Sequence, residues 1–274
     1  MVLGTRLKDL REKARVPLRT AAQDIDVAEL TVRRMEKAEV GLKIPYVRAL
    51  LQLYAVPAAE IDVFLGLAKQ ANVPGWWNPW RDVLPGWFSA YVSLESAARL
   101  IRSYEPHYVP GLLQTGDYAR ALFVNGLPNA SDEDRERRVA LRVKRQELLA
   151  GPDAPAVWAV LDETVLRRPV GGAAVMRAQI DRLLAATHLS NITLQIMPFA
   201  AGPHVGAFGP FHYFRFEMPE RPDIVYTEGL TGAAYLEDRL DVVSYLEALN
   251  RMTAQAASVD ASRTILEETR KEYS

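Results

Sequence analysis

The sequence predicts two domains of different fold class: a mainly α amino-terminal domain of five helices, and a larger α+β domain with a small mixed or antiparallel sheet. The first seventy residues carry apolar side chains at helical spacing. From Val157 onward, short runs rich in β-branched and aromatic residues predict strands. A stretch rich in Trp, Pro and Gly separates the two patterns. We therefore expect domains at residues 1–70 and 93–274, joined by a connector at 71–92.

The composition is that of an ordinary globular protein, with 49% hydrophobic and 24% charged residues among 274. No apolar run reaches the ~18 residues that a membrane span requires, and the amino terminus has no apolar signal core. Cysteine is absent, which excludes disulfides and thiolate metal sites. These observations predict a cytoplasmic protein without membrane contact.

The net charge of −1 does not indicate a polyanionic partner, but the charge is unevenly distributed. Residues 1–44 contain ten Lys or Arg residues against seven Asp or Glu residues. A mildly basic amino-terminal segment is compatible with contact to a nucleic acid.

Three short helices are expected before residue 38. Apolar residues spaced four, three and four apart give the first helix one apolar stripe. Pro17 separates it from a second helix over residues 18–25, because proline restricts the residue before it and suits the first turn of a helix. After a turn at residues 26–28, a third helix is expected over residues 29–37, with Val32 and Met35 buried.

The outer face of this third helix is the first candidate site. If Val32 and Met35 face inward, Arg33 and Arg34 face outward. Two short helices joined by a tight turn form the helix-turn-helix arrangement, which lays its second helix in the DNA major groove. Arginine matches guanine O6 and N7 and also pairs with phosphate, although a solvated arginine pair is the plainer interpretation. The DNA-binding candidates are Arg19, Glu29, Leu30, Thr31, Arg33, Arg34, Lys37 and Lys43.

The run from Thr31 to Glu36, followed by Gly41 and Pro45, resembles the XRE-type helix-turn-helix family. In that family a Glu at the end of the third helix ties it to its neighbours. The resemblance therefore implies a structural role for Glu36. Fourth and fifth helices are expected over residues 45–54 and 58–68, where apolar residues recur at core spacing.

The sequence departs from the family pattern at three places. Asp26 replaces the usual turn glycine, which is tolerable because Asp visits left-handed conformations more readily than most residues. Ala28 replaces the capping Ser, so Asp26 and Glu29 are expected to form a capping box instead. Leu18 stands where the family often has a DNA-contacting Gln, which predicts moderate DNA affinity per monomer.

The connector contains four of the five tryptophans: Trp76, Trp77, Trp80 and Trp87. A flexible linker would not carry this much aromatic area. Two interpretations stay open. The rings pin the first domain onto the second, or they line a ligand pocket or a dimer seam.

Helices are expected over residues 93–105 and after Thr115. A further helix over 131–149 has acidic residues in its first turn, which suits the helix dipole. Its expected i,i+4 pairs are Glu133–Arg137 and Asp134–Arg138. This helix is interpreted either as a solvated, salt-bridged face or as a second surface for DNA or an acidic partner.

Beyond residue 156, five strands are expected, with a helix at 174–187 between them and helices at 239–256 and 261–271 after them. Asp162 and Glu163 are adjacent on a strand and face opposite sides, so they do not form an acid/base pair. The four histidines are too scattered for a metal signature, and no phosphate loop, dinucleotide motif or nucleophile elbow is present. We therefore expect no enzyme, no metal and no cofactor.

The glycine-rich loop "FAAGPHVGAFGPF" lies between two expected strands. A long glycine loop inside a compact domain is a mobile lid, a binding loop or a wide hairpin. Because aromatic residues accompany it, we expect it to bound an effector pocket or a docking site for a partner protein. The candidates beside the four tryptophans are His204, Gly206, Phe208 and Phe211.

Six blocks, taken in order, resemble the carboxy-terminal domain of WhiJ-type actinobacterial regulators: YEPHYVPGLLQTGDYARA, RVKRQELL, LDETVLRRPVGG, VMRAQIDRLL, ITLQIMPFAAGPHVGAFGPFHYFRF and IVYTEG. The resemblance implies a regulator, often encoded beside a small partner protein in an antitoxin-like pair. We expect a homodimer on double-stranded DNA, with a small-molecule effector or the small partner acting on the larger domain. The alternative is an antitoxin-like protein-interaction module with secondary DNA binding.

Overall fold

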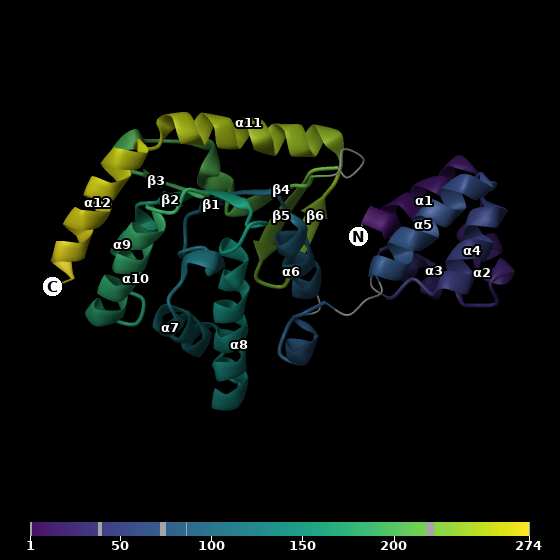
Figure 1. Cartoon of the computed structure of the whole chain (residues 1–274), viewed down its shortest axis with the longest axis horizontal. Helices are drawn as coiled ribbons and strands as arrows, with labels where there is room; N and C mark the ends of the chain where they lie inside the picture. The colour runs from purple at the N-terminus through teal and green to yellow at the C-terminus, as the bar shows by residue number, and fades with distance from the viewer. Residues whose placement is uncertain (1, 38–39, 72–74, 86, 218–221, 274) are drawn as a thin grey trace. The chain divides into compact units, whose positions relative to one another are not determined.

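The computed structural model describes residues 2–37, 40–71, 75–85, 87–217 and 222–273 (Figure 1). The chain divides into two compact units, Met1–Asn78 and Pro79–Ser274. No helix in the described ranges combines the length and the apolar composition that a membrane crossing requires.

The first unit is helical, as the apolar spacing predicts. Pro17 immediately precedes its second helix with an extended backbone (φ −63°, ψ 148°), and Pro45 lies in the first turn of the fourth. The helices are α1 (Val2–Lys13), α2 (Leu18–Asp24), α3 (Glu29–Glu36), α4 (Ile44–Leu53) and α5 (Ala58–Ala71).

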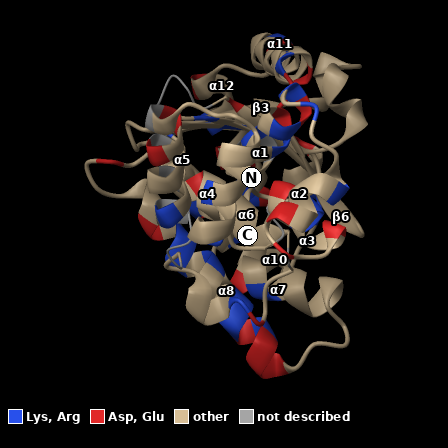
Figure 2. Cartoon of the chain, turned by 90° about the vertical axis from the view of Figure 1, so that its right-hand side faces the viewer, with Lys and Arg blue, Asp and Glu red and all other residues tan. Residues whose placement is uncertain are grey.

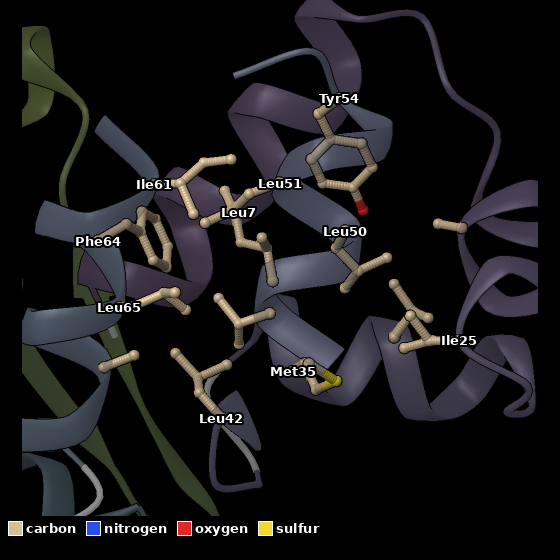
Figure 3. Packing of buried hydrophobic residues seen from close by; sticks show 14 of the residues in the cluster. Leu7, Ile25, Met35, Leu42, Leu50, Leu51, Tyr54, Ile61, Phe64 and Leu65 are labelled. Carbon is tan, nitrogen blue, oxygen red and sulfur yellow. The ribbon is translucent and has the colours of Figure 1, made fainter. Parts of the chain in front are cut away.

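A single apolar core joins these helices, as the close view in Figure 3 shows. Leu7 of α1, Val32 and Met35 of α3, and Leu50 and Leu51 of α4 are almost entirely buried. Burying side chains of this kind contributes about 1.5–3 kcal/mol each. Contacts between helices therefore hold together segments that are individually too short to be stable alone.

The second unit contains both helices and strands. Its strands are β1 (Leu100–Glu105), β2 (Ala156–Asp162), β3 (Ile192–Met197), β4 (Phe211–Arg215), β5 (Ile224–Gly229) and β6 (Gly232–Leu236). Its helices are α6 (Phe88–Ala97), α7 (Gly116–Gly126), α8 (Asp132–Arg145), α9 (Thr164–Arg167), α10 (Ala173–Ala186), α11 (Arg239–Gln255) and α12 (Val259–Glu272). Single-turn 3₁₀ helices are η1 (Asn78–Trp80), η2 (Gly111–Leu113), η3 (Gln146–Leu149), η4 (Phe199–Ala201) and η5 (Val205–Phe208).

A mixed or an antiparallel sheet was expected, and the sheet is mixed. It is also larger than the small sheet that was expected. Its six strands run in the order β3-β2-β1-β4-β5-β6. β1, β2 and β3 are parallel to one another, whereas β4, β5 and β6 join as antiparallel neighbours. β1 therefore lies where the parallel half meets the antiparallel half.

The helix expected over residues 93–105 is wrong in its second half. α6 ends at Ala97, Ala98 is extended (φ −74°, ψ 139°), and residues 100–105 form β1. β1 pairs on both edges and is buried along its central residues. Apolar residues on both faces of a buried strand give no two-residue alternation, so periodicity alone does not separate such a strand from a buried helix.

Helices cover both faces of the sheet (Figure 1). α11 packs on one face, where Leu249 and Met252 join a core with Tyr104 and Tyr213. On the other face the Tyr91 ring of α6 packs edge to face against His212 and Phe214 of β4 and lies tilted against Tyr226 of β5.

A buried ion pair fixes α6 to α8. The Arg145 guanidinium donates to both Glu95 carboxylate oxygens, at 2.8 and 2.7 Å. Its centre lies 5.2 Å from the centroid of the Tyr91 ring. Burial would lower the pKa of Arg145, but the adjacent Glu95 carboxylate outweighs it and the net shift is upward.

The two ion pairs expected within α8, Glu133–Arg137 and Asp134–Arg138, are wrong: neither forms among the residues that the structure describes. Arg137 pairs with Asp82, outside the helix, and the Arg137 pKa rises because Asp82 accepts its hydrogen bonds. Glu136 pairs with Arg120 at 2.5 Å. Figure 2 shows the acidic start of α8 and the basic residues that follow it. Spacing in the sequence indicates partners on the same helix. Asp82 and Arg120, the partners of Arg137 and Glu136, come instead from other segments that pack against α8.

Candidate nucleic-acid interface

The turn between α2 and α3 adopts the expected conformation. Asp26 has a φ of 51°, so it occupies the left-handed region in which a glycine is usual. The expected capping box is wrong: α3 begins at Glu29, with Ala28 as the N-cap residue and without a side-chain cap. Because Ala28 has no oxygen on its side chain, the α3 amino terminus has no side-chain acceptor at this position.

The buried face of α3 contains Val32, Met35 and Glu36. Its other face is exposed at Leu30, Arg33, Arg34 and Lys37, and Leu30 retains 54% of its surface. These four positions are related by i, i+3, i+4 and i+7 spacing, which places them in one row along the helix. We call them the α3 row. Thr31 is half-buried and Glu29 is exposed beside it.

Glu36 is held by Arg11 of α1. The Arg11 Nε and Nη2 atoms donate to the two Glu36 oxygens at 2.6 and 3.1 Å, and Nη1 donates to the Val16 carbonyl at 3.1 Å. Arg11 and Glu36 are 8% and 6% exposed. The hydrogen bond to Glu36 raises the pKa of Arg11 despite its burial. Glu36 thus ties α3 to α1, in the structural role that the family resemblance implied.

Arg11 was not predicted from the sequence as the partner of Glu36, although its position in its helix indicates burial. It follows Leu3 and Leu7 at four-residue intervals, so it lies in line with the apolar stripe of α1. A cation on an apolar stripe requires a buried acceptor. Glu36, at the end of a helix whose other inward residues are apolar, is that acceptor.

The remaining DNA-binding candidates lie on neighbouring elements of the first unit. Arg19 is exposed on α2. Lys43 is exposed immediately before α4, and its ammonium lies 5.3 Å from the Tyr46 ring centroid. Leu18 is half-buried and packs against the core, which explains why this position of α2 holds an apolar residue.

The glycine-rich loop of the second unit borders two cavities. The larger, of about 760 Å³, includes Phe208 and Phe211 in its lining. The smaller, of about 310 Å³, includes His204 and Gly206 together with Tyr104, His107 and Asp162. The loop therefore borders cavities, and its role in binding an effector or a partner protein stays a prediction.

His204 anchors the loop to the carboxyl ends of β1 and β2. Its Nδ1 accepts from the Gly206 N–H at 3.1 Å, and its Nε2 lies 3.5 Å from an Asp162 oxygen. That same oxygen accepts from the Tyr104 hydroxyl at 3.1 Å. A Cβ on Gly206 would lie 2.4 Å from the Tyr104 ring, so the close approach requires glycine. No group of three or more His, Cys, Asp or Glu side chains in the described ranges could hold a metal ion.

The four connector tryptophans fall in different elements. Trp76 and Trp77 lie edge to face in the first unit, with ring centroids 6.1 Å apart. Trp80 ends η1, and Trp87 precedes α6, where its carbonyl accepts from the Tyr235 hydroxyl at 2.6 Å. Both cavities are lined by other residues, so a role for these rings in a ligand pocket stays a prediction.

Comparison with known proteins assigns a family to each part of the chain. Residues 2–64 match the model described as "Helix-turn-helix domain", which covers the α2–turn–α3 geometry. Residues 88–268 match the model described as "Domain of unknown function (DUF5753)". No curated protein and no solved structure gives a significant match. The second match spans more than half of the chain, which therefore belongs to the DUF5753 family and carries an amino-terminal helix-turn-helix domain.

Proposed function

We propose that this protein is a transcription regulator that binds double-stranded DNA sequence-selectively, with α3 in the major groove. The observation that carries the proposal is the α3 row, a set of two arginines, a lysine and a leucine exposed on the second helix of a helix-turn-helix. The protein acts by binding rather than by catalysis, and this action needs no cofactor.

Each residue type suits a different part of the duplex. Arg33 and Arg34 match the O6 and N7 acceptors of guanine, which one guanidinium contacts through two parallel hydrogen bonds. Leu30 offers an apolar contact for a thymine methyl group. Arg19, Lys37 and Lys43 are placed for phosphates, which set the register of the protein on DNA.

The Arg11–Glu36 pair supports this role because it fixes α3 against α1. A reading helix must hold its side chains within a fraction of an ångström to discriminate bases. The ion pair lies on the buried side of α3 and leaves the α3 row open to solvent.

The larger unit serves as the regulatory domain, which binds the signal that controls DNA binding. We propose that it forms a homodimer, so that two α3 helices contact half-sites one helical turn apart, and that it receives an effector or a small partner protein. The glycine-loop cavities support the effector role because their volumes reach the range of small-molecule sites. We place the protein in the cytoplasm, where its operator is accessible.

The test is fluorescence anisotropy of the full chain on DNA from upstream of its own gene, across a salt series. The variant is Arg33→Ala/Arg34→Ala, and the matched control is Arg177→Ala/Arg182→Ala on α10. We expect selective, steeply salt-dependent binding that the first variant loses and the control keeps. Equal affinity for unrelated DNA, or full binding by the α3 variant, would refute the assignment and favour a protein partner.

A further inference from the structure

The larger cavity lies between α11 and the β4–β5–β6 end of the sheet, and small side chains create it. Ser244 and Ala248 lie one turn apart on the same face of α11. On the facing hairpin, Gly229, Gly232 and Ala233 have a short side chain or none. The short side chains leave a space between the two walls. Its volume of about 760 Å³ falls within the ~300–1,000 Å³ range of small-molecule sites.

Aromatic and aliphatic residues make this cavity apolar. The rings of Phe211 and Tyr245 meet edge to face in its lining, with centroids 4.8 Å apart. Phe208 also lines it and yet is 97% exposed. Leu230, between the lining residues Gly229 and Thr231, is fully exposed. Exposed apolar side chains gathered at a cavity indicate a surface that another molecule covers.

The two charged side chains that line the cavity, Glu228 and Arg251, differ in their interactions. The Glu228 carboxylate accepts from the Tyr226 hydroxyl at 2.5 Å. Arg251 is exposed on the same face of α11 as Ala248, and no ion pair joins it to another residue in the part of the chain that the structure describes. Among the described residues, Arg251 is therefore the charged group of the lining that has no partner.

We propose that this cavity binds a small amphipathic carboxylate, either acyl or aryl. Its apolar part packs against Phe208, Phe211 and Tyr245, and its carboxylate pairs with Arg251, whose planar fork fits two oxygens. The proposal rests on the proposed function only for its consequence, which is that occupancy of the cavity alters DNA binding. The binding step itself is independent of DNA.

The test uses the full chain and the fluorescent probe 8-anilinonaphthalene-1-sulfonate, an aromatic anion that brightens in apolar sites. We expect saturable binding of the probe and its displacement by decanoate or 1-naphthoate. The better of these two competitors identifies an acyl or an aryl ligand. Decanol, which lacks the charge, should displace the probe at least tenfold less well than the better carboxylate; equal displacement by decanol would overturn the role of Arg251.

Two variants with matched controls locate the site. Ser244→Trp fills the cavity and should abolish saturable probe binding, whereas Val243→Trp, on a different face of α11, should not. Arg251→Gln should weaken displacement by the carboxylate at least tenfold, whereas Arg177→Gln on α10 should leave it unchanged. Unaltered probe binding and displacement in both Ser244→Trp and Arg251→Gln would overturn the proposal.

Folding and DNA binding are checked separately. The probe also brightens on partly unfolded protein, so each variant must retain the near-ultraviolet circular dichroism of the parent. Arg251→Gln changes an exposed side chain and keeps the test decisive if Ser244→Trp misfolds. If the cavity proposal fails, the protein still binds DNA in the anisotropy measurement. If the proposed function fails, the carboxylate still displaces the probe, so the two outcomes are distinguishable.

Discussion

Helices α3 and α8 are both rich in arginine, but Arg33 of α3 and the inward-directed arginines of α8 have different surroundings. In α8 the guanidinium of Arg145 is buried against Glu95, Arg137 pairs with Asp82, and Arg142 donates to Gln114 at 2.8 Å. In α3 the side chain of Arg33 is exposed to solvent. The longer and more basic helix therefore directs these charges to partners within its own unit, whereas the shorter helix presents the charge of Arg33 outward.

The difference shows that the number of arginines in a helix is a poor guide to an interface. A guanidinium that already satisfies a carboxylate has to give up that partner before it can bind a phosphate or a base. The interpretation of α8 as a solvated, salt-bridged face is therefore closer to its structure than the interpretation as a second DNA surface, although part of that face is buried.

The largest effect is expected from Arg145→Met. The change leaves the Glu95 carboxylate buried without its partner, which typically costs about 3–5 kcal/mol. Urea unfolding followed by circular dichroism measures the loss. The double variant Glu95→Leu/Arg145→Met should recover most of it, because replacing both charges by apolar groups removes the unpaired group. A loss below about 1 kcal/mol in the single variant would contradict a structural role for α8.

Arg33→Lys tests whether α3 reads bases. Lysine keeps the charge but lacks the fork that donates two parallel hydrogen bonds. We expect the affinity for the selected DNA site to fall by about 1–3 kcal/mol, with little change for random DNA. Anisotropy on both DNAs measures the ratio. An unchanged ratio would show that Arg33 contacts phosphate instead of a base.

Lys37→Gln has a smaller and less selective effect. Loss of one phosphate contact should lower affinity for every sequence alike and reduce the slope of log K against log salt by about 0.9. The salt series on the selected and random DNAs provides the measurement. A change in selectivity without a change in slope would place Lys37 at a base edge.

Arg137→Ala on α8 should have the smallest effect. The pair with Asp82 is exposed, and exposed ion pairs add little to stability. We expect no resolvable change in either DNA affinity or the thermal midpoint. A clear loss of DNA affinity would break the comparison, because it would place α8 at the nucleic acid as well.

The first unit could be predicted closely because its information is local. The spacing of Val32 and Met35 fixed the inner face of α3, and Asp26 occupies the left-handed turn that was expected of it. The capping box failed because α3 begins at Glu29, with Ala28 rather than Asp26 as its N-cap. The partner of Glu36 lies twenty-five residues earlier in the chain, and a pattern within one helix does not specify such a contact.

The second unit was predicted less completely because its information is distant in the sequence. Residues 100–105 become a strand because β2 and β4 supply partners on both edges. The larger cavity likewise depends on Gly232, Ala248 and Phe208 meeting from three separate elements. The glycine-rich loop could be identified in the sequence, but Arg251 could not, because nothing near it distinguishes it from other exposed arginines of a long helix.

The central place of β1 also sets an order of folding. Its parallel neighbour begins at Ala156 and its antiparallel neighbour at Phe211, so the sheet cannot close until the ribosome has released more than a hundred further residues. The helices of the first unit pack on one another within residues 2–71, and contacts that are closer together in the sequence favour rapid folding. During synthesis, the segment that contains α3 can therefore be compact while β1 still awaits its partners, and the slow step of maturation is expected in the sheet.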